Sequence, residues 1–188
     1  MSISGHKVYG PKGVGALIVQ SQIRSQIQPL FFGGGQQYGL RSGTVSPFLV
    51  VGLAEAVKIA TFEMDKDNFL LSNMSNLFLK SLANRTSIHL NGSMQNRLPN
   101  NLNIRFEMLA SDLMVKTPNV AISIGSACLS IGGSIEPSHV LKALGLSDEE
   151  IKKSARISVG RFTNERDISL AVNYLLQTLT SNFSDLSR

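Results

Sequence analysis

The sequence of 188 residues has a single cysteine, Cys128, and no run of eighteen apolar residues. One cysteine excludes an internal disulfide bond, which is typical of proteins from reducing compartments. Without a long apolar run no segment is predicted to span a membrane, and the N-terminus lacks the layout of a signal peptide. We therefore expect a cytoplasmic protein, or one from another reducing compartment such as the mitochondrial matrix.

Acidic and aromatic residues are also few. There are 13 Asp and Glu against 18 Lys and Arg, so the net charge is +5. A basic chain raises the question of nucleic-acid binding. However, aromatic residues make up only 6% of the sequence, and the Lys and Arg residues are scattered singly. The sequence therefore predicts no nucleic-acid partner, and a mildly basic, solvated surface that suits docking to an acidic protein.

The first segment that points to chemistry lies at residues 4–13 and reads SGHKVYGPKG. It places Lys7 just before a turn rich in glycine and proline, and an apolar run at residues 14–19 predicts a buried strand. A lysine held on a rigid turn beside Ser4 and His6 is what a pyridoxal-phosphate (PLP) enzyme needs for its Schiff base. A solvated surface lysine before a hairpin is the alternative for an isolated motif of this kind.

Two further segments are built from small and polar residues. Residues 33–44 read GGGQQYGLRSGT, and such glycines let backbone amides approach a phosphate while the arginine and hydroxyl groups add donors. Residues 123–138 read SIGSACLSIGGSIEPS and surround Cys128 with residues that build a loop rather than a core. In a loop the thiol is available for reaction, whereas a lone cysteine is more often an inert buried hydrophobe.

Taken together and in this order, the three segments resemble the cysteine desulfurases, PLP enzymes of the class V aminotransferase type. RISVGRFT at residues 156–163 is a fourth match. The chain is similar to the branch that supplies sulfur to iron–sulfur cluster assembly. It implies an α/β fold, the C-terminal part of a PLP-dependent transferase of fold type I. Residues 1–63 would be the tail of the large cofactor domain, and residues 64–188 the small C-terminal α/β domain.

The resemblance implies that Lys7 and Cys128 are catalytic. Lys7 matches the lysine that carries PLP and moves the α-proton of the substrate. Cys128 matches the nucleophile that takes the sulfur of L-cysteine as a persulfide while L-alanine is released. The implied partners are L-cysteine and a sulfur acceptor or iron–sulfur scaffold protein, and no metal ion is implied.

The resemblance also implies residues that bind the cofactor and the substrate. Ser4 and His6, with Lys7, match residues that hold PLP, the first two through its phosphate. Thr44 matches a threonine that reaches the phosphate in the partner subunit of a homodimer. Arg156 matches the arginine that binds the substrate carboxylate, where a planar guanidinium forms two parallel hydrogen bonds.

In the resembled family, the Schiff-base lysine lies near the middle of a chain roughly twice this length. The groups that contact the cofactor ring belong to the first half, so about half of the cofactor pocket is expected outside this sequence. The chain is then the C-terminal half of a cysteine desulfurase, acting as a homodimer or with a complementing N-terminal half. The alternative is an inactive remnant or partner-binding fragment without cofactor. A selenocysteine lyase or cysteine-sulfinate enzyme is a further reading within the family.

Hydrophobic periodicity and capping residues predict the remaining elements. Three longer helices are expected, at residues 47–62, 65–83 and 164–180. The small domain is expected to have strands at residues 88–90, 101–106, 120–124 and 155–159, and short helices at residues 111–116 and 137–143. Ser147 and Glu150 have the spacing of a helix capping box.

Overall fold

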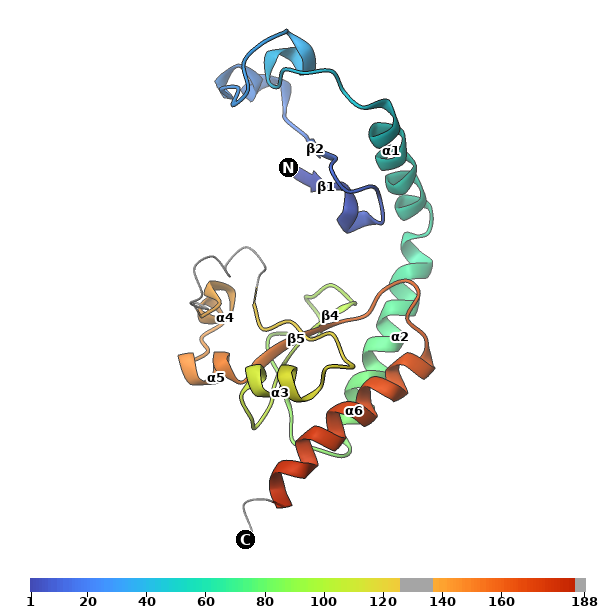
Figure 1. Cartoon of the computed structure of the whole chain (residues 1–188), viewed down its shortest axis with the longest axis vertical. Coiled ribbons are helices and arrows are strands. Elements are labelled where there is room, and N and C mark those ends of the chain that lie inside the picture. The colour runs from blue at the N-terminus through green and yellow to red at the C-terminus, as the bar shows by residue number, and fades with distance from the viewer. Residues whose placement is uncertain (126–136, 185–188) are drawn as a thin grey trace. The chain divides into compact units, whose positions relative to one another are not determined.

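The computed structural model describes residues 1–125 and 137–184, with side chains described as far as residue 180. Two compact units are present, Met1–Asp65 and Lys66–Arg188. Each unit contains both helices and strands, so the expected α/β class is confirmed (Figure 1). Within the described residues, no helix is both long and apolar enough to cross a membrane.

The first unit begins with a small hairpin. Strand β1 (Ser2–Ser4) pairs antiparallel with β2 (Gly15–Leu17), and the 3-10 helix η1 (Gly5–Val8) follows β1 directly. The predicted strand after the turn is therefore present, but its predicted burial is wrong, because every residue of β2 is exposed. A sheet of two strands cannot bury its own faces.

Helix α1 (Pro47–Phe62) is the longest element of the first unit and has the predicted limits. Pro47 lies in its first turn, where a missing amide hydrogen breaks no helical bond. Leu53 is the buried side chain of α1, whereas Phe48 and Phe62 are each 87% exposed. Two further 3-10 helices, η2 (Ser21–Gln26) and η3 (Gln36–Gly39), lie between β2 and α1.

The second unit is built on an antiparallel sheet of three strands in the order β3-β4-β5. These strands are β3 (His89–Leu90), β4 (Asn101–Arg105) and β5 (Ser154–Ser158). Leu102 and Ile104 of β4 and Ala155 and Ile157 of β5 are buried, whereas the residues between them are more exposed. This alternation follows from the period of two in a strand and gives the sheet one apolar and one polar face.

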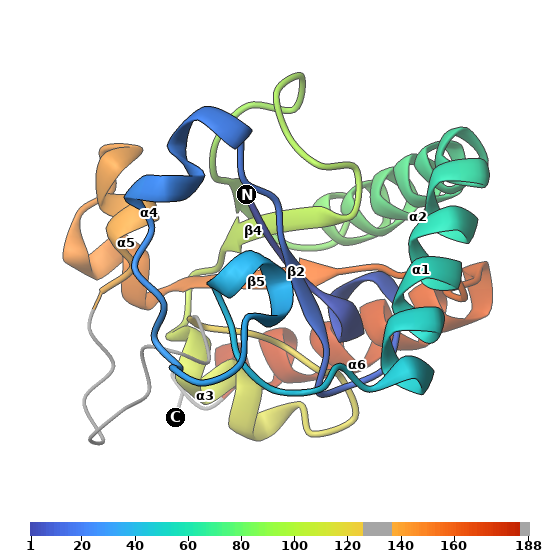
Figure 2. The ribbon, with the colours of Figure 1, turned by 90° about the horizontal axis from the view of Figure 1, so that it is seen from above.

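Two long helices, α2 (Met64–Ala83) and α6 (Glu165–Ser184), share the core of the second unit with the sheet (Figures 1 and 2). Phe78 and Leu82 of α2 and Val172 and Leu175 of α6 are at most 2% exposed. The short helix α3 (Ala110–Lys116) adds Leu113 to the same core. Burial of each such side chain contributes about 1.5–3 kcal/mol to folding.

The short helices α4 (His139–Ala143) and α5 (Asp148–Lys152) lie side by side in both views (Figures 1 and 2). Gly145 ends the α4 region with a left-handed φ of 86°. The predicted capping box of α5 is confirmed, since Glu150 N donates to Ser147 Oγ at 3.3 Å and Ser147 N donates to the Glu150 carboxylate at 2.9 Å.

The predicted strand at residues 120–124 does not form. Val120 N donates to Thr117 O at 3.1 Å in a turn, so this amide is used locally rather than in the sheet. Only Ser123 reaches β5, where it forms an isolated antiparallel bridge with Arg156. The sheet therefore gains one residue pair at its β5 edge instead of a fourth strand.

Candidate cofactor and substrate site

Lys7 lies on η1, in the connection between β1 and β2. Backbone hydrogen bonds fix this connection, since Gly5 N donates to Val14 O and Gly10 N donates to Gly5 O, each at 2.9 Å. Gly5 is buried, and a Cβ atom there would lie 2.8 Å from Val14 O and 2.9 Å from Pro11 O. A residue larger than glycine does not fit, so the close approach of backbone to backbone defines where Lys7 is held.

Ser4, His6 and Lys7 follow one another closely at the start of this turn, and the first two side chains are in contact. Ser4 Oγ and His6 Nδ1 lie 3.2 Å apart and form a hydrogen bond. Ser4 is half-buried, whereas the side chains of His6 and Lys7 are exposed. A hydroxyl, an imidazole and an ammonium group form a donor set that suits a phosphate, and the amine also suits an aldehyde. These residues therefore fit the phosphate and the reactive carbon of PLP.

The glycine-rich segment is folded onto itself. Ser42 Oγ donates to Phe32 O at 3.1 Å, and Gly43 N donates to Gln36 Oε1 at 3.2 Å. These groups, expected as open phosphate donors, are thus engaged within the segment. Thr44 follows them and is exposed, so its hydroxyl is accessible to a ligand or a second chain. Its role at a phosphate stays a prediction.

Arg156 lies on the polar face of β5, opposite Asn103 of β4. At the other edge Arg156 N donates to Ser123 O at 2.7 Å, and Ser123 N donates to Arg156 O at 3.1 Å. The guanidinium Nη2 donates to Ser123 Oγ at 3.3 Å. Sequence reasoning missed this contact, because a single serine 33 residues away from Arg156 carries no signal of it. Arg156 is thus attached to the segment that leads toward Cys128, which itself lies outside the described residues.

The predicted site residues are divided between the two units. Ser4, His6, Lys7 and Thr44 belong to Met1–Asp65, and Arg156 belongs to Lys66–Arg188. Ser4, His6 and Lys7 form a first cluster along one turn, and Arg156 and Ser123 form a second cluster within the second unit.

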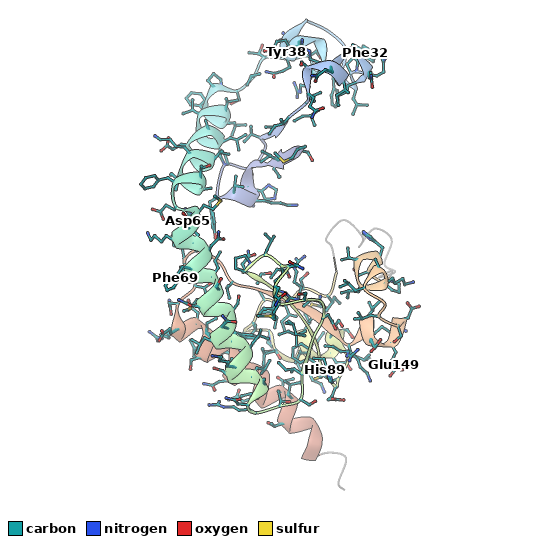
Figure 3. All side chains as sticks on the ribbon, turned by 180° about the vertical axis from the view of Figure 1, so that it is seen from behind. Phe32, Tyr38, Asp65, Phe69, His89 and Glu149 are labelled. Carbon is teal, nitrogen blue, oxygen red and sulfur yellow. The ribbon has the colours of Figure 1, made fainter. Side chains whose placement is uncertain are left out.

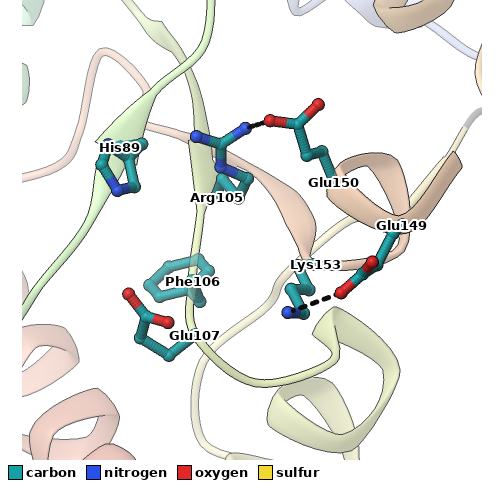
Figure 4. A pocket seen from close by; sticks show the side chains of 7 residues that line it. All are labelled: His89, Arg105, Phe106, Glu107, Glu149, Glu150 and Lys153. Atoms are coloured by element: carbon teal, nitrogen blue, oxygen red, sulfur yellow. Dashed lines mark hydrogen bonds and ion pairs between the residues drawn. The ribbon is translucent and has the colours of Figure 1, made fainter. Parts of the chain in front are cut away.

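A cavity of about 190 Å³ in the second unit contains none of the predicted residues (Figure 4). It is lined by His89, Arg105, Phe106, Glu107, Glu149, Glu150 and Lys153. Its charges are largely paired, Arg105 with Glu150, and Lys153 with Glu149 at 3.1 Å. The pKa of Glu150 is lowered because the Ser147 amide and hydroxyl donate to its carboxylate, with a further contribution from Arg105. We interpret these charges as structural, because they pair within α5 and between α5 and β4.

The model of the aminotransferase class-V family matches residues 1–170. The chain belongs to this family. Within it, the chain is similar to the cysteine desulfurases: IscS of Ruthia magnifica subsp. Calyptogena magnifica is 43% identical over 188 residues, which cover 100% of this chain and 46% of that protein. The resemblance drawn from the sequence is confirmed. The chain spans about half the length of the curated relatives it matches.

Solved structures agree with this assignment. A NifS-like protein superimposes with a TM-score of 0.82 and 28% identity over 95% of this chain and 46% of its own length. A structure described as SspA in complex with cysteine is 37% identical, with a TM-score of 0.61, over 87% of this chain and 44% of its own length.

Proposed function

We propose that this chain forms the C-terminal half of a PLP-dependent cysteine desulfurase. The observation that carries the proposal is the glycine-locked turn that carries Lys7 directly after the hydrogen-bonded Ser4 and His6, in a chain similar to cysteine desulfurases. The reaction transfers the sulfur of L-cysteine to the thiol of Cys128. The carbon–sulfur bond breaks, a sulfur–sulfur bond forms, and L-alanine leaves.

The first cluster supplies the cofactor side of the site. PLP, when bound, provides an electron sink that labilises bonds at the substrate α-carbon. Ser4 and His6 would hold its phosphate, and Thr44 would reach the phosphate bound by a second subunit of a homodimer. Lys7 Nζ accepts the α-proton and can return it, because the rigid turn keeps the amine in place.

The second cluster supplies the substrate side. Arg156 binds the substrate carboxylate through the two parallel donors of its guanidinium. Cys128, as a thiolate, accepts the substrate sulfur and then passes it to an acceptor protein or an iron–sulfur scaffold. The names of the relatives support L-cysteine as the substrate, and so does the cysteine in the SspA complex. A reducing compartment would keep Cys128 available as a thiol.

A non-catalytic, partner-binding fragment is the second candidate. The observation in its favour is the exposed apolar surface of the first unit, where Phe31, Phe32 and Phe48 are 64%, 81% and 87% exposed. Phe32 projects from the segment between β2 and α1 (Figure 3). Such a surface is typical of a binding interface.

Alanine formation from L-cysteine separates the two candidates. The chain is assayed with PLP, alone and together with the complementing N-terminal half. We expect alanine in the complemented sample, a loss of at least about 100-fold in Lys7→Ala and Cys128→Ser, and retained activity in Lys12→Ala, the neighbouring lysine of the same motif. No alanine in the complemented sample would contradict the proposal and favour the fragment.

A further inference from the structure

A row of polar side chains crosses the sheet of the second unit through Arg156. Asn91 Nδ2 donates to Asn103 Oδ1 at 2.7 Å, and Asn91 N donates to Asn103 O at 2.9 Å. Asn103 stands opposite Arg156, and Arg156 stands opposite Ser123. Residues directly opposite each other in an antiparallel pair project from the same face of the sheet. Arg156 is therefore flanked on both sides by uncharged polar residues.

The hydroxyl of Ser123 has a defined orientation. Its single proton is donated to Gly125 O at 2.8 Å, which leaves the oxygen lone pairs as acceptors. Arg156 Nη2 donates to this oxygen at 3.3 Å. A guanidinium group can only donate, so the two hydrogen bonds at Ser123 are mutually consistent. The two backbone bonds between Ser123 and Arg156 keep both residues in register.

We propose that Ser123 is a positioning residue for substrate binding. It holds the guanidinium of Arg156 in the orientation that receives the carboxylate of an amino-acid substrate. The inference rests on the proposed function, which gives Arg156 this substrate. An exposed arginine samples many rotamers, and a ligand that must order it binds more weakly than a ligand that finds it ordered. Loss of the Ser123 hydroxyl should therefore weaken substrate binding and leave the later steps unchanged.

Steady-state kinetics of the complemented enzyme test this role. We expect Ser123→Ala to raise KM for L-cysteine about fivefold with kcat changed less than about twofold, and Ser123→Thr to restore KM. Ser158→Ala is the control. Ser158 lies two residues from Arg156 on the same face of β5, and its truncation should leave KM unchanged. In an Arg156→Ala background, Ser123→Ala should add nothing. An equal rise in KM in that background would overturn the proposal.

Nitrogen-15 NMR of the chain gives a readout that does not depend on activity. The Nε–Hε signal of Arg156, assigned through its loss in Arg156→Lys, should show a lower order parameter in Ser123→Ala and a restored one in Ser123→Thr. An unchanged order parameter would overturn the positioning role. A lowered order parameter in an enzyme that forms no alanine would instead uphold the contact and overturn the proposed function.

Discussion

The two units of the chain differ in what holds them together. The hydrophobic core cluster lies entirely within Lys66–Arg188, where α2, α6 and the sheet bury one another. In Met1–Asp65, Leu53 is the buried hydrophobic side chain among the described residues. Phe32 and Tyr38 there are more than 80% exposed (Figure 3). The unit that carries Lys7 therefore depends on backbone turns, and the unit that carries Arg156 depends on side-chain packing.

This difference has a consequence for the proposed enzyme. Exposed apolar surface of this kind favours association, because covering it releases water. We therefore expect the first unit to gain order when a complementing half or a second subunit covers it. The second unit already has the core that an independent domain requires.

The largest effect should come from the core of the second unit. Phe78 is 1% exposed, so Phe78→Ala removes a buried ring and should lower the free energy of unfolding by about 3–5 kcal/mol. Phe48→Ala truncates an 87% exposed ring on α1 and should change the free energy of unfolding by less than about 0.5 kcal/mol. Urea unfolding followed by circular dichroism measures both. Equal effects would contradict the contrast between the units.

Ion pairs offer a second comparison. Arg161 Nε donates to both carboxylate oxygens of Asp67, at 3.0 and 2.9 Å, and each side chain is 17% exposed. Arg161→Met leaves Asp67 without this partner and should cost about 2 kcal/mol. The exposed Lys58–Glu55 pair of α1 is the control, since Lys58→Ala should cost less than about 0.5 kcal/mol. Urea unfolding measures both variants. A loss of unfolding free energy in Arg161→Met as small as that in Lys58→Ala would contradict this comparison.

The turn that carries Lys7 is the tightly specified part of the first unit. Gly5→Ala places a methyl group against two backbone oxygens and should cost about 1–2 kcal/mol of local stability. Gly35→Ala meets no atom within 4 Å and is the matched control. Amide exchange at Gly10, whose N–H donates to Gly5 O, reports the opening of this turn. Unchanged protection of Gly10 in Gly5→Ala would show that the turn is not tight.

Local signals in the sequence predicted local structure well. Pro47 marks the start of α1, and the Ser147–Glu150 box forms as expected. Asn164 caps α6 reciprocally, since Asp167 N donates to Asn164 Oδ1 and Asn164 N donates to an Asp167 carboxylate oxygen, both at 3.1 Å. Such patterns succeed because the interacting groups lie within one helical turn.

Contacts between distant residues could not be predicted in this way. The apolar run at residues 14–19 has the composition of a buried strand, but its burial depends on what packs against it. Ser123 and Arg156 are 33 residues apart, and Asp67 and Arg161 are 94 apart. No periodicity connects such pairs. The motif around Lys7 indicated a turn correctly because the glycines that determine the turn lie within ten residues of one another. Cys128 lies outside the described residues, so its role stays a prediction.

The smallest effect concerns Glu150, whose pKa lies below its ordinary value of 4.5 because the Ser147 amide, then the Ser147 hydroxyl and Arg105, favour its ionised form. A lowered pKa means that the carboxylate stabilises the fold above the unfolded-state pKa and loses this contribution as pH falls through the folded-state value. Glu150→Gln should therefore lower Tm slightly at pH 7, and the difference from the parent chain should shrink below about pH 4.5 and vanish once the pH is below the folded-state pKa of Glu150. Glu55→Gln is the exposed control. A difference in Tm independent of pH would contradict this account.

The most direct test of the central claim is a visible absorbance spectrum of the purified chain with added PLP. The account predicts a weak absorbance band that is lost in Lys7→Ala and kept in Lys12→Ala, because Lys7, on η1 next to Ser4 and His6, is the lysine proposed to carry the cofactor. A spectrum that is the same in both variants would contradict the claim that this turn forms the cofactor side of a cysteine desulfurase site.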